Sequence, residues 1–209
     1  MKKLVLFLSL LVFNFSFFTS FCQSKKTDSL LSRLTTDKLD TNRVNDWVGL
    51  AVCYADANKT DTVIKLAMQA QVLAQQLHFN SGEMAAYNVM GYAYQLVSNF
   101  DKAIENYTNA EKLAERIGDK AHVAKFNGKI GTVYSDKGDF AKALDYYFMD
   151  LKVVEELGDK KAIALVTGDI GNAYELQGNY TKALEYNFKA LQMDEDNGDK
   201  RSISVVNCN

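Results

Sequence analysis

The sequence repeats itself with a period of 40 residues. Residues 118–157 and 158–197 align without gaps and are identical at 16 of 40 positions. The same register, more diverged, recurs at 90–117 and again at 50–77. Chance would produce only a few identities, so these segments indicate duplication of one supersecondary unit. The sequence therefore predicts four repeats and the first part of an incomplete fifth: 38–77, 78–117, 118–157, 158–197 and 198–209.

Each repeat is expected to contain two helices. In the third repeat, Ala124, Ile130 and Tyr134 follow the three-and-four spacing of one helical face, "DKGD" interrupts the pattern, and a second apolar stripe follows. Gly158 stands where a helix C-terminal glycine is expected. Three residues are predicted to cap the second helices: Asn99, Asp139 and Asn179.

Neither helix of a repeat can bury its apolar stripe alone, so each repeat must pack against its neighbours. This predicts an all-α fold, a right-handed superhelical solenoid of antiparallel helix pairs. Gly131 and Gly171 fall inside first helices, where a small residue lets an adjacent helix approach closely. Residues 23–37 are expected to form a lead-in helix, around Asp28 to Leu34, that caps the array.

The repeats resemble the tetratricopeptide repeat. The shared pattern is Leu/Ile-Gly-x-x-Tyr, then Gly-x-Tyr/Phe-x-x-Ala, then an aromatic residue and a further Ala. Trp47 falls where the family often has its tryptophan. In the third repeat the pattern is carried by Ile130, Gly131, Tyr134, Gly138, Phe140, Ala143 and Tyr147, and in the fourth by Ile170, Gly171, Tyr174, Gly178, Tyr180, Ala183 and Ala190.

The repeats depart from the commonest form of the family, which has about 34 residues and a Pro near its end. These have 40 residues, and the chain has no Pro. The longer form is similar to the arrays of cell-polarity adaptors and bacterial peptide-sensing regulators, and to the exported N-terminal arrays of bacterial sensor kinases and nucleotide cyclases. The resemblance implies non-covalent binding of a peptide or protein, with no catalysis and no cofactor.

In the family, the first helix of each repeat lines the binding groove. Carried over onto this sequence, the resemblance implies a mixed polar and aromatic groove that suits an extended peptide or a partner's helix. Gly128 and Gly168 occupy places where the family's carboxylate clamp has lysine, so capture of an acidic C-terminus is not expected. The predicted groove residues are Asn88, Tyr92, Gln95, Lys125, Thr132, Ser135, Leu165, Asn172 and Glu175.

Composition and charge exclude other classes of function. Removing the first 22 residues leaves 22 basic and 26 acidic side chains, a net charge of −4, which disfavours nucleic acid as a partner. His78 and His122 have no acidic or cysteine cluster at a metal-ligand spacing, so no metal site is expected. Self-association remains an alternative to a peptide or protein ligand.

The N-terminus has the order of a secretory signal peptide: two lysines, an apolar run over 4–18, then small residues. Ser20 and Cys22 fit the small positions before a cleavage site, so cleavage after Cys22 is expected to leave Gln23 first. A lipoprotein that keeps Cys22 is disfavoured by the bulky Phe21, and an uncleaved anchor is disfavoured by polar residues in the span. We expect an exported, periplasmic protein that makes no other membrane contact.

Two hypotheses for the role of the array remain open. In the first, the chain is the N-terminal sensory or assembly region of a larger bacterial signalling protein, truncated inside its fifth repeat. In the second, it is a free-standing periplasmic scaffold or assembly factor. "GDKRSISVVNCN" at 198–209 favours the first hypothesis, because it repeats the start of a first helix and lacks the second helix that would cover it.

Overall fold

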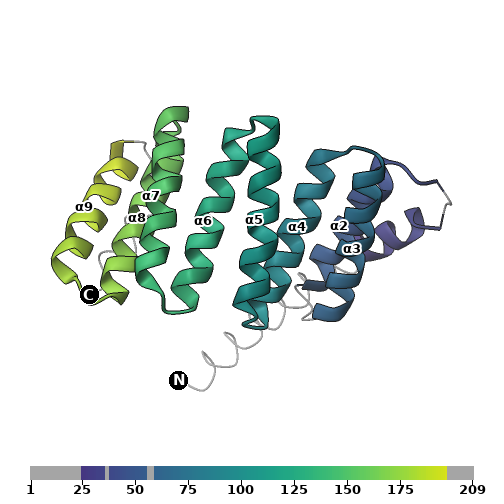
Figure 1. Ribbon diagram of the computed structural model, residues 1–209, viewed down its shortest axis with the longest axis horizontal. Helices are drawn as coiled ribbons and strands as arrows, with labels where there is room; N and C mark the ends of the chain where they lie inside the picture. The colour runs from purple at the N-terminus through teal and green to yellow at the C-terminus, as the bar shows by residue number, and fades with distance from the viewer. Residues whose placement is uncertain (1–24, 36–37, 56–58, 197–209) are drawn as a thin grey trace, which may run out of the picture. The chain divides into compact units, whose positions relative to one another are not determined.

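The computed structural model describes residues 25–35, 38–55 and 59–196. The predicted signal peptide, including the cleavage site after Cys22, lies outside the described residues. The predicted start of a fifth repeat at 198–209 lies outside them as well. All secondary structure in the described ranges is helical, which confirms the predicted all-α class. A helix at 25–33 is followed by eight further helices (Figure 1): α2 (Thr41–Ala55), α3 (Thr60–Gln76), α4 (Asn80–Leu96), α5 (Phe100–Ile117), α6 (Lys120–Asp136), α7 (Phe140–Leu157), α8 (Lys160–Leu176) and α9 (Tyr180–Asp196).

The helices divide between two compact units. Unit 1 extends to Ala93, and unit 2 begins at Tyr94, so the boundary falls within α4. Each of the four predicted repeats contains one pair of consecutive helices, from α2–α3 to α8–α9. The helix at 25–33 occupies the stretch where the lead-in helix was expected.

Local sequence signals start and end these helices as expected. The side chain of Asn99 accepts a hydrogen bond from the backbone N–H of Lys102. In the same way, Asp139 accepts from the N–H of Lys142 and Asn179 from that of Lys182. Gly158 ends α7 with φ +68°, a left-handed conformation that glycine adopts without steric cost. His78 adopts φ +51° in the equivalent turn between α3 and α4. The predicted caps are therefore confirmed.

Two apolar clusters lie among the described residues of unit 1. In the first, Leu30 from the helix at 25–33 packs with Leu50 and Cys53, so Cys53 is a buried core residue. In the second, Val44 of α2 packs with alanines of α3 and α4, and Trp47 flanks the cluster. The helix at 25–33 therefore covers apolar surface of α2 that would otherwise face water.

The core of unit 2 is continuous over the third and fourth repeats. It joins α6, α7, α8 and α9 through one cluster of buried residues: Ala124, Ala143, Leu144, Tyr147, Val154, Val166, Ile170, Ala173, Tyr174 and Ala183. Leu144 of α7 and Ile170 of α8 belong to different repeats, so neighbouring repeats share one core.

Glycine sets the spacing between the two helices of a repeat. A Cβ atom at Gly131 would lie 2.7 Å from the ring of Tyr147 and 3.3 Å from the carbonyl oxygen of Ala143. A Cβ atom at Gly171 would lie 3.2 Å from the backbone nitrogen of Asn187. These distances are shorter than ordinary van der Waals contacts, which confirms that both glycines allow a close helix approach.

Candidate functional site

The predicted groove residues lie on the first helices of three repeats: α4, α6 and α8. Residues of α6 alternate between a buried face, which carries Ile130 and Gly131, and an exposed face, which carries Lys125 and Thr132. On α8, the predicted residues Leu165, Asn172 and Glu175 are all exposed. The helical period that builds the core therefore also determines which side chains remain available to a ligand.

Unit 1 contributes two of the predicted residues, both on α4. Tyr92 is exposed and can present its ring and hydroxyl to a ligand. Asn88 is only partly accessible, and its Oδ1 atom is buried without a hydrogen-bond partner in the part of the chain that the structure describes. Its carboxamide oxygen is therefore not presented to solvent.

In unit 2, two predicted residues are already engaged in internal hydrogen bonds. The side-chain nitrogen of Gln95 donates to Asp136 over 2.6 Å, and its oxygen accepts from the Tyr107 hydroxyl over 3.3 Å. The Thr132 hydroxyl donates to the carbonyl oxygen of Gly128 over 3.0 Å. Both side chains therefore link helices or hold a helix turn, and a ligand would have to compete for their polar atoms.

The remaining unit 2 residues are better placed for binding. Leu165 is 70% exposed on α8, and the Asn172 amide lies two turns further along the same helix. The side chains of Asn172 and Glu175 form no hydrogen bond or ion pair with another described residue. Ser135 is partly accessible, and Lys125 is exposed. These predicted residues of α6 and α8 thus combine one apolar side chain, Leu165, with polar groups.

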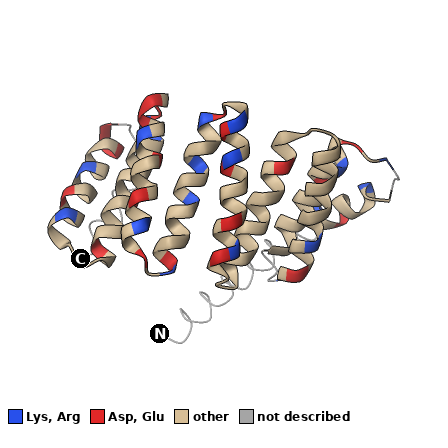
Figure 2. Cartoon of the chain, in the orientation of Figure 1, with Lys and Arg blue, Asp and Glu red and all other residues tan. Residues whose placement is uncertain are grey.

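Charges of both signs are interspersed along the helices (Figure 2). Lys129, one turn after Lys125 on α6, was not predicted as a site residue. Its ammonium group lies over the Tyr107 ring, 5.3 Å from the ring centroid. Burial, and secondarily the charge of Lys125, lower the pKa of Lys129.

The sequence analysis also missed two acidic residues of unit 2. Asp150 of α7 is buried, and burial together with the charge of Asp169 raises the pKa of Asp150 to about 7. Close packing raises the pKa of Asp169 on α8 to about 6, although its side chain keeps a solvent-exposed surface. The sequence did hold one signal for Asp150, because the equivalent residues of the other three repeats are alanine: Ala70, Ala110 and Ala190.

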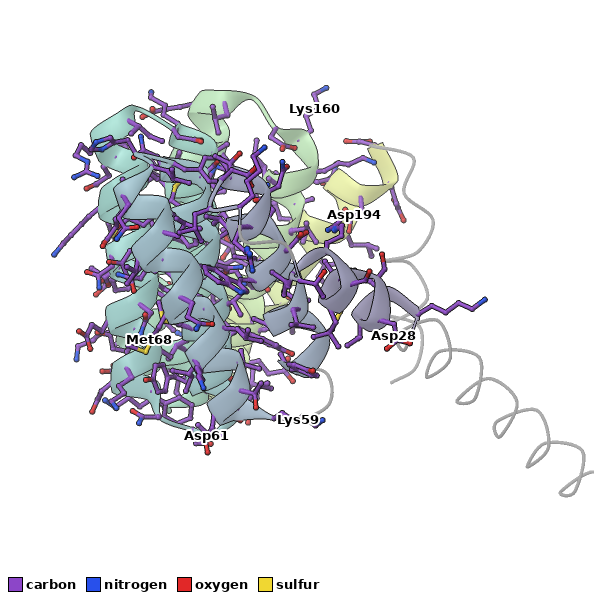
Figure 3. The ribbon with its side chains drawn as sticks, turned by 90° about the vertical axis from the view of Figure 1, so that its right-hand side faces the viewer. Asp28, Lys59, Asp61, Met68, Lys160 and Asp194 are labelled. Carbon is purple, nitrogen blue, oxygen red and sulfur yellow. The ribbon has the colours of Figure 1, made fainter. Side chains whose placement is uncertain are left out.

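A separate apolar groove lies within unit 1, between the first half of α2 and the second half of α3. Its walls include Trp47, Met68 (labelled in Figure 3) and Val72, with Leu39 at its edge. Met68 and Val72 are each 53% exposed. This groove was not predicted from the sequence, because the binding residues were expected on the first helices of the repeats.

The described residues provide neither a metal-binding cluster nor a membrane-spanning helix. Within 25–35, 38–55 and 59–196, no group of three or more His, Cys, Asp or Glu side chains could hold a metal ion. The His122 ring nitrogen Nδ1 instead lies 2.8 Å from the Asp119 carboxylate, at the cap of α6. Over the same described ranges, no helix is both long enough and apolar enough to span a bilayer.

Solved structures of low sequence identity share the fold. Aspartyl phosphate phosphatase F from Bacillus subtilis superposes with a TM-score of 0.74 at 16% identity, over 88% of this chain and 51% of that one. A Rap protein in complex with competence and sporulation factor matches with a TM-score of 0.70 at 15% identity, over 80% of this chain and 47% of that one. A signal transduction ATPase with a tetratricopeptide repeat sensor, from Pyrococcus horikoshii, matches with a TM-score of 0.66 at 21% identity, over 77% and 24% of the two chains.

The chain therefore spans about half the length of the Bacillus phosphatase that it resembles. No curated protein matches its sequence significantly. A family model for the tetratricopeptide repeat matches twice, at residues 82–149 and 123–196, which together make up more than half of the chain. The helix pairs, their shared cores and this match agree: the chain belongs to the tetratricopeptide repeat family, and its fold is that of the family's helical solenoids.

Proposed function

We propose that this protein is a non-catalytic module that binds an extended peptide or a helix of a partner protein through the first helices of its repeats. The observation that carries the proposal is the surface of α8, where exposed Leu165 lies two turns from the uncommitted amide of Asn172. An apolar side chain beside a free amide suits a peptide, because the amide can pair with the peptide backbone while the apolar group contacts a side chain.

Peptide or protein binding also accords with the structural relatives. The similar Rap protein was solved in complex with competence and sporulation factor. The similar ATPase from Pyrococcus horikoshii carries its repeats as a sensor within a longer chain. We propose by analogy that this chain is the sensory or assembly region of a larger signalling protein.

Loss of the Asn172 amide is expected to lower the affinity for a peptide by up to about tenfold, because one hydrogen bond is worth about 0.5–1.5 kcal/mol. The probe would be a peptide selected from a displayed library of random sequences, with its affinity measured by calorimetry. Asn172→Ala should leave the melting temperature unchanged, because the side chain is exposed and makes no internal hydrogen bond.

Gln192→Ala supplies the matched control. Gln192 is an exposed amide on α9, the second helix of the same repeat, so its loss should leave peptide affinity unchanged. Equal affinity for the wild-type protein and Asn172→Ala would contradict binding on α8. Equal weakening by Asn172→Ala and Gln192→Ala would indicate a non-specific surface effect.

We further propose that the protein is exported, with the signal peptide removed after Cys22. Expression in a Gram-negative host should place the mature protein in the periplasm, and its N-terminal sequencing should begin at Gln23. Retention of Lys2 and Lys3 in the purified protein would contradict cleavage. A mature protein that begins with a lipidated Cys22 would instead establish the lipoprotein alternative.

A further inference from the structure

One repeat carries a buried carboxylate where the others carry a methyl group. Asp150 lies on α7 and is 5% exposed, and the equivalent alanines of the first, second and fourth repeats are also buried. Alanine needs no hydrogen bond in this place, whereas an aspartate buried there must either find a partner or take up a proton. The third repeat therefore differs from the others in chemistry and not in fold.

The surroundings of Asp150 do not stabilise its ionised form. Its Oδ2 atom packs against Gly128 of α6, where an added Cβ would lie only 2.6 Å away. Its Oδ1 atom is buried and has no hydrogen-bond partner among the described residues. The carboxyl group thus occupies the space left by a glycine, and its buried Oδ1 atom receives no hydrogen bond from a described residue.

In the part of the chain that the structure describes, no positive charge offsets that of an ionised Asp150. On α6 the neighbour is Gly128, which is uncharged. On α8 the charge that acts on Asp150 is a second carboxylate, Asp169. On α7 itself, the Tyr147 phenol lies near both carboxylates, and its hydroxyl donates a hydrogen bond to Thr132 over 3.4 Å. Ionisation of Asp150 therefore places two like charges where α7 packs on α8.

We propose that Asp150 and Asp169 form a proton-sensitive joint between the third and fourth repeats, closed when Asp150 is protonated and loosened when both carboxylates are ionised. Ionisation of Asp150 beside an ionised Asp169 loosens the α7–α8 contact. The pKa values, raised to about 6 for Asp169 and about 7 for Asp150, put this change near neutral pH.

Repeat arrays transmit such a change locally. The stability of a repeat depends on its interface with its neighbours, so a weaker α7–α8 contact lets the α8–α9 pair open without unfolding the rest of unit 2. This inference does not depend on the proposed binding function. It does predict that the α8 surface with Leu165 and Asn172 is better ordered in acid.

Amide hydrogen exchange, read by mass spectrometry on the full chain, tests the joint. After correction for intrinsic exchange, protection in α8 and α9 should fall by about tenfold or more between about pH 5.5 and about pH 8, with little change in α5. Asp150→Asn keeps the shape of the side chain but cannot ionise, so its protection should differ by less than about twofold between the same conditions. Asp150→Ala, which restores the residue of the other repeats, should behave in the same way.

Two further variants separate the joint from general effects of charge. Asp145→Asn removes an exposed carboxylate of α7 and should keep the wild-type response. Asp169→Asn should keep a response but move its midpoint to lower pH, because Asp150 loses a like-charged neighbour. Equal protection of the wild-type protein at both pH values would overturn the proposal, and so would a full response in Asp150→Asn.

Discussion

Replacing Asp150 by alanine is expected to stabilise the protein by up to about 4 kcal/mol above neutral pH. The native carboxyl group is buried, its Oδ1 atom lacks a partner, and its pKa is raised from 3.8 to about 7. Each unit of difference between the folded and unfolded pKa is worth about 1.4 kcal/mol, which sets the limit. Equilibrium unfolding in urea at several pH values would measure the effect.

The sign of the pH dependence follows from proton uptake. Between pH 3.8 and about 7 the folded protein holds a proton on Asp150 that the unfolded chain has released, so the wild-type protein loses stability as pH rises through this window. Below the window both states are protonated, and above it both are ionised and the full cost is present. The raised pKa of Asp169 acts in the same direction, but its own share of the cost is smaller because its side chain is more exposed than that of Asp150.

Asp150→Ala should therefore differ little from the wild-type protein in acid and most strongly in base. Asp145→Ala, at an exposed position of the same helix, should change stability by no more than about 0.5 kcal/mol at any pH. A stabilisation by Asp150→Ala of the same size in acid and in base would point to better packing instead of a removed charge.

Replacing Tyr107 by alanine is expected to lower the free energy of unfolding by about 3–5 kcal/mol, the range for truncating a large buried aromatic side chain. Tyr107 is fully buried on α5. Its ring lies beneath the Lys129 ammonium group, and its hydroxyl donates to Gln95, which in turn donates to Asp136. The substitution would leave a cavity and also break this chain of contacts.

Two further variants show how much of the lost stability comes from the hydrogen bond and how much from burial of the ring. Tyr107→Phe keeps the ring and removes the hydrogen bond, so it should cost about 0.5–1.5 kcal/mol. Tyr180→Ala removes a tyrosine that is 67% exposed on α9 and should cost no more than about 0.5 kcal/mol. Urea unfolding followed by far-ultraviolet circular dichroism would compare the variants. Similar losses for Tyr107→Ala and Tyr180→Ala would contradict the assigned core role of Tyr107.

Most of the fold could be predicted because its signals are local. The cap at Asp139, the left-handed glycine at 158 and the close approach at Gly131 each depend on a few neighbouring residues and recur with the repeat. A repeat also presents the same signal several times, so a weak match in one copy is supported by a stronger match in the next. The helix pairs and the family followed from this redundancy.

The candidate site could be predicted less well than the fold from such local signals. The repeat register predicted that Gln95 faces a ligand. In unit 2, however, its amide donates a hydrogen bond to Asp136, a residue 41 positions away. The repeat register also predicted that Asn88 lines the groove, yet its carboxamide oxygen is buried. A repeat pattern indicates which way a side chain faces, but not which partners it finds once neighbouring helices have packed.

The sequence by itself determined that this chain is an all-helical array of tetratricopeptide repeats, because helical periodicity and duplication are properties of the order of residues. Only the tertiary structure decided that Asp150 is buried against Gly128 and close to Asp169. The reason is that burial and the field of a neighbouring charge arise between helices, where residues distant in the sequence come together.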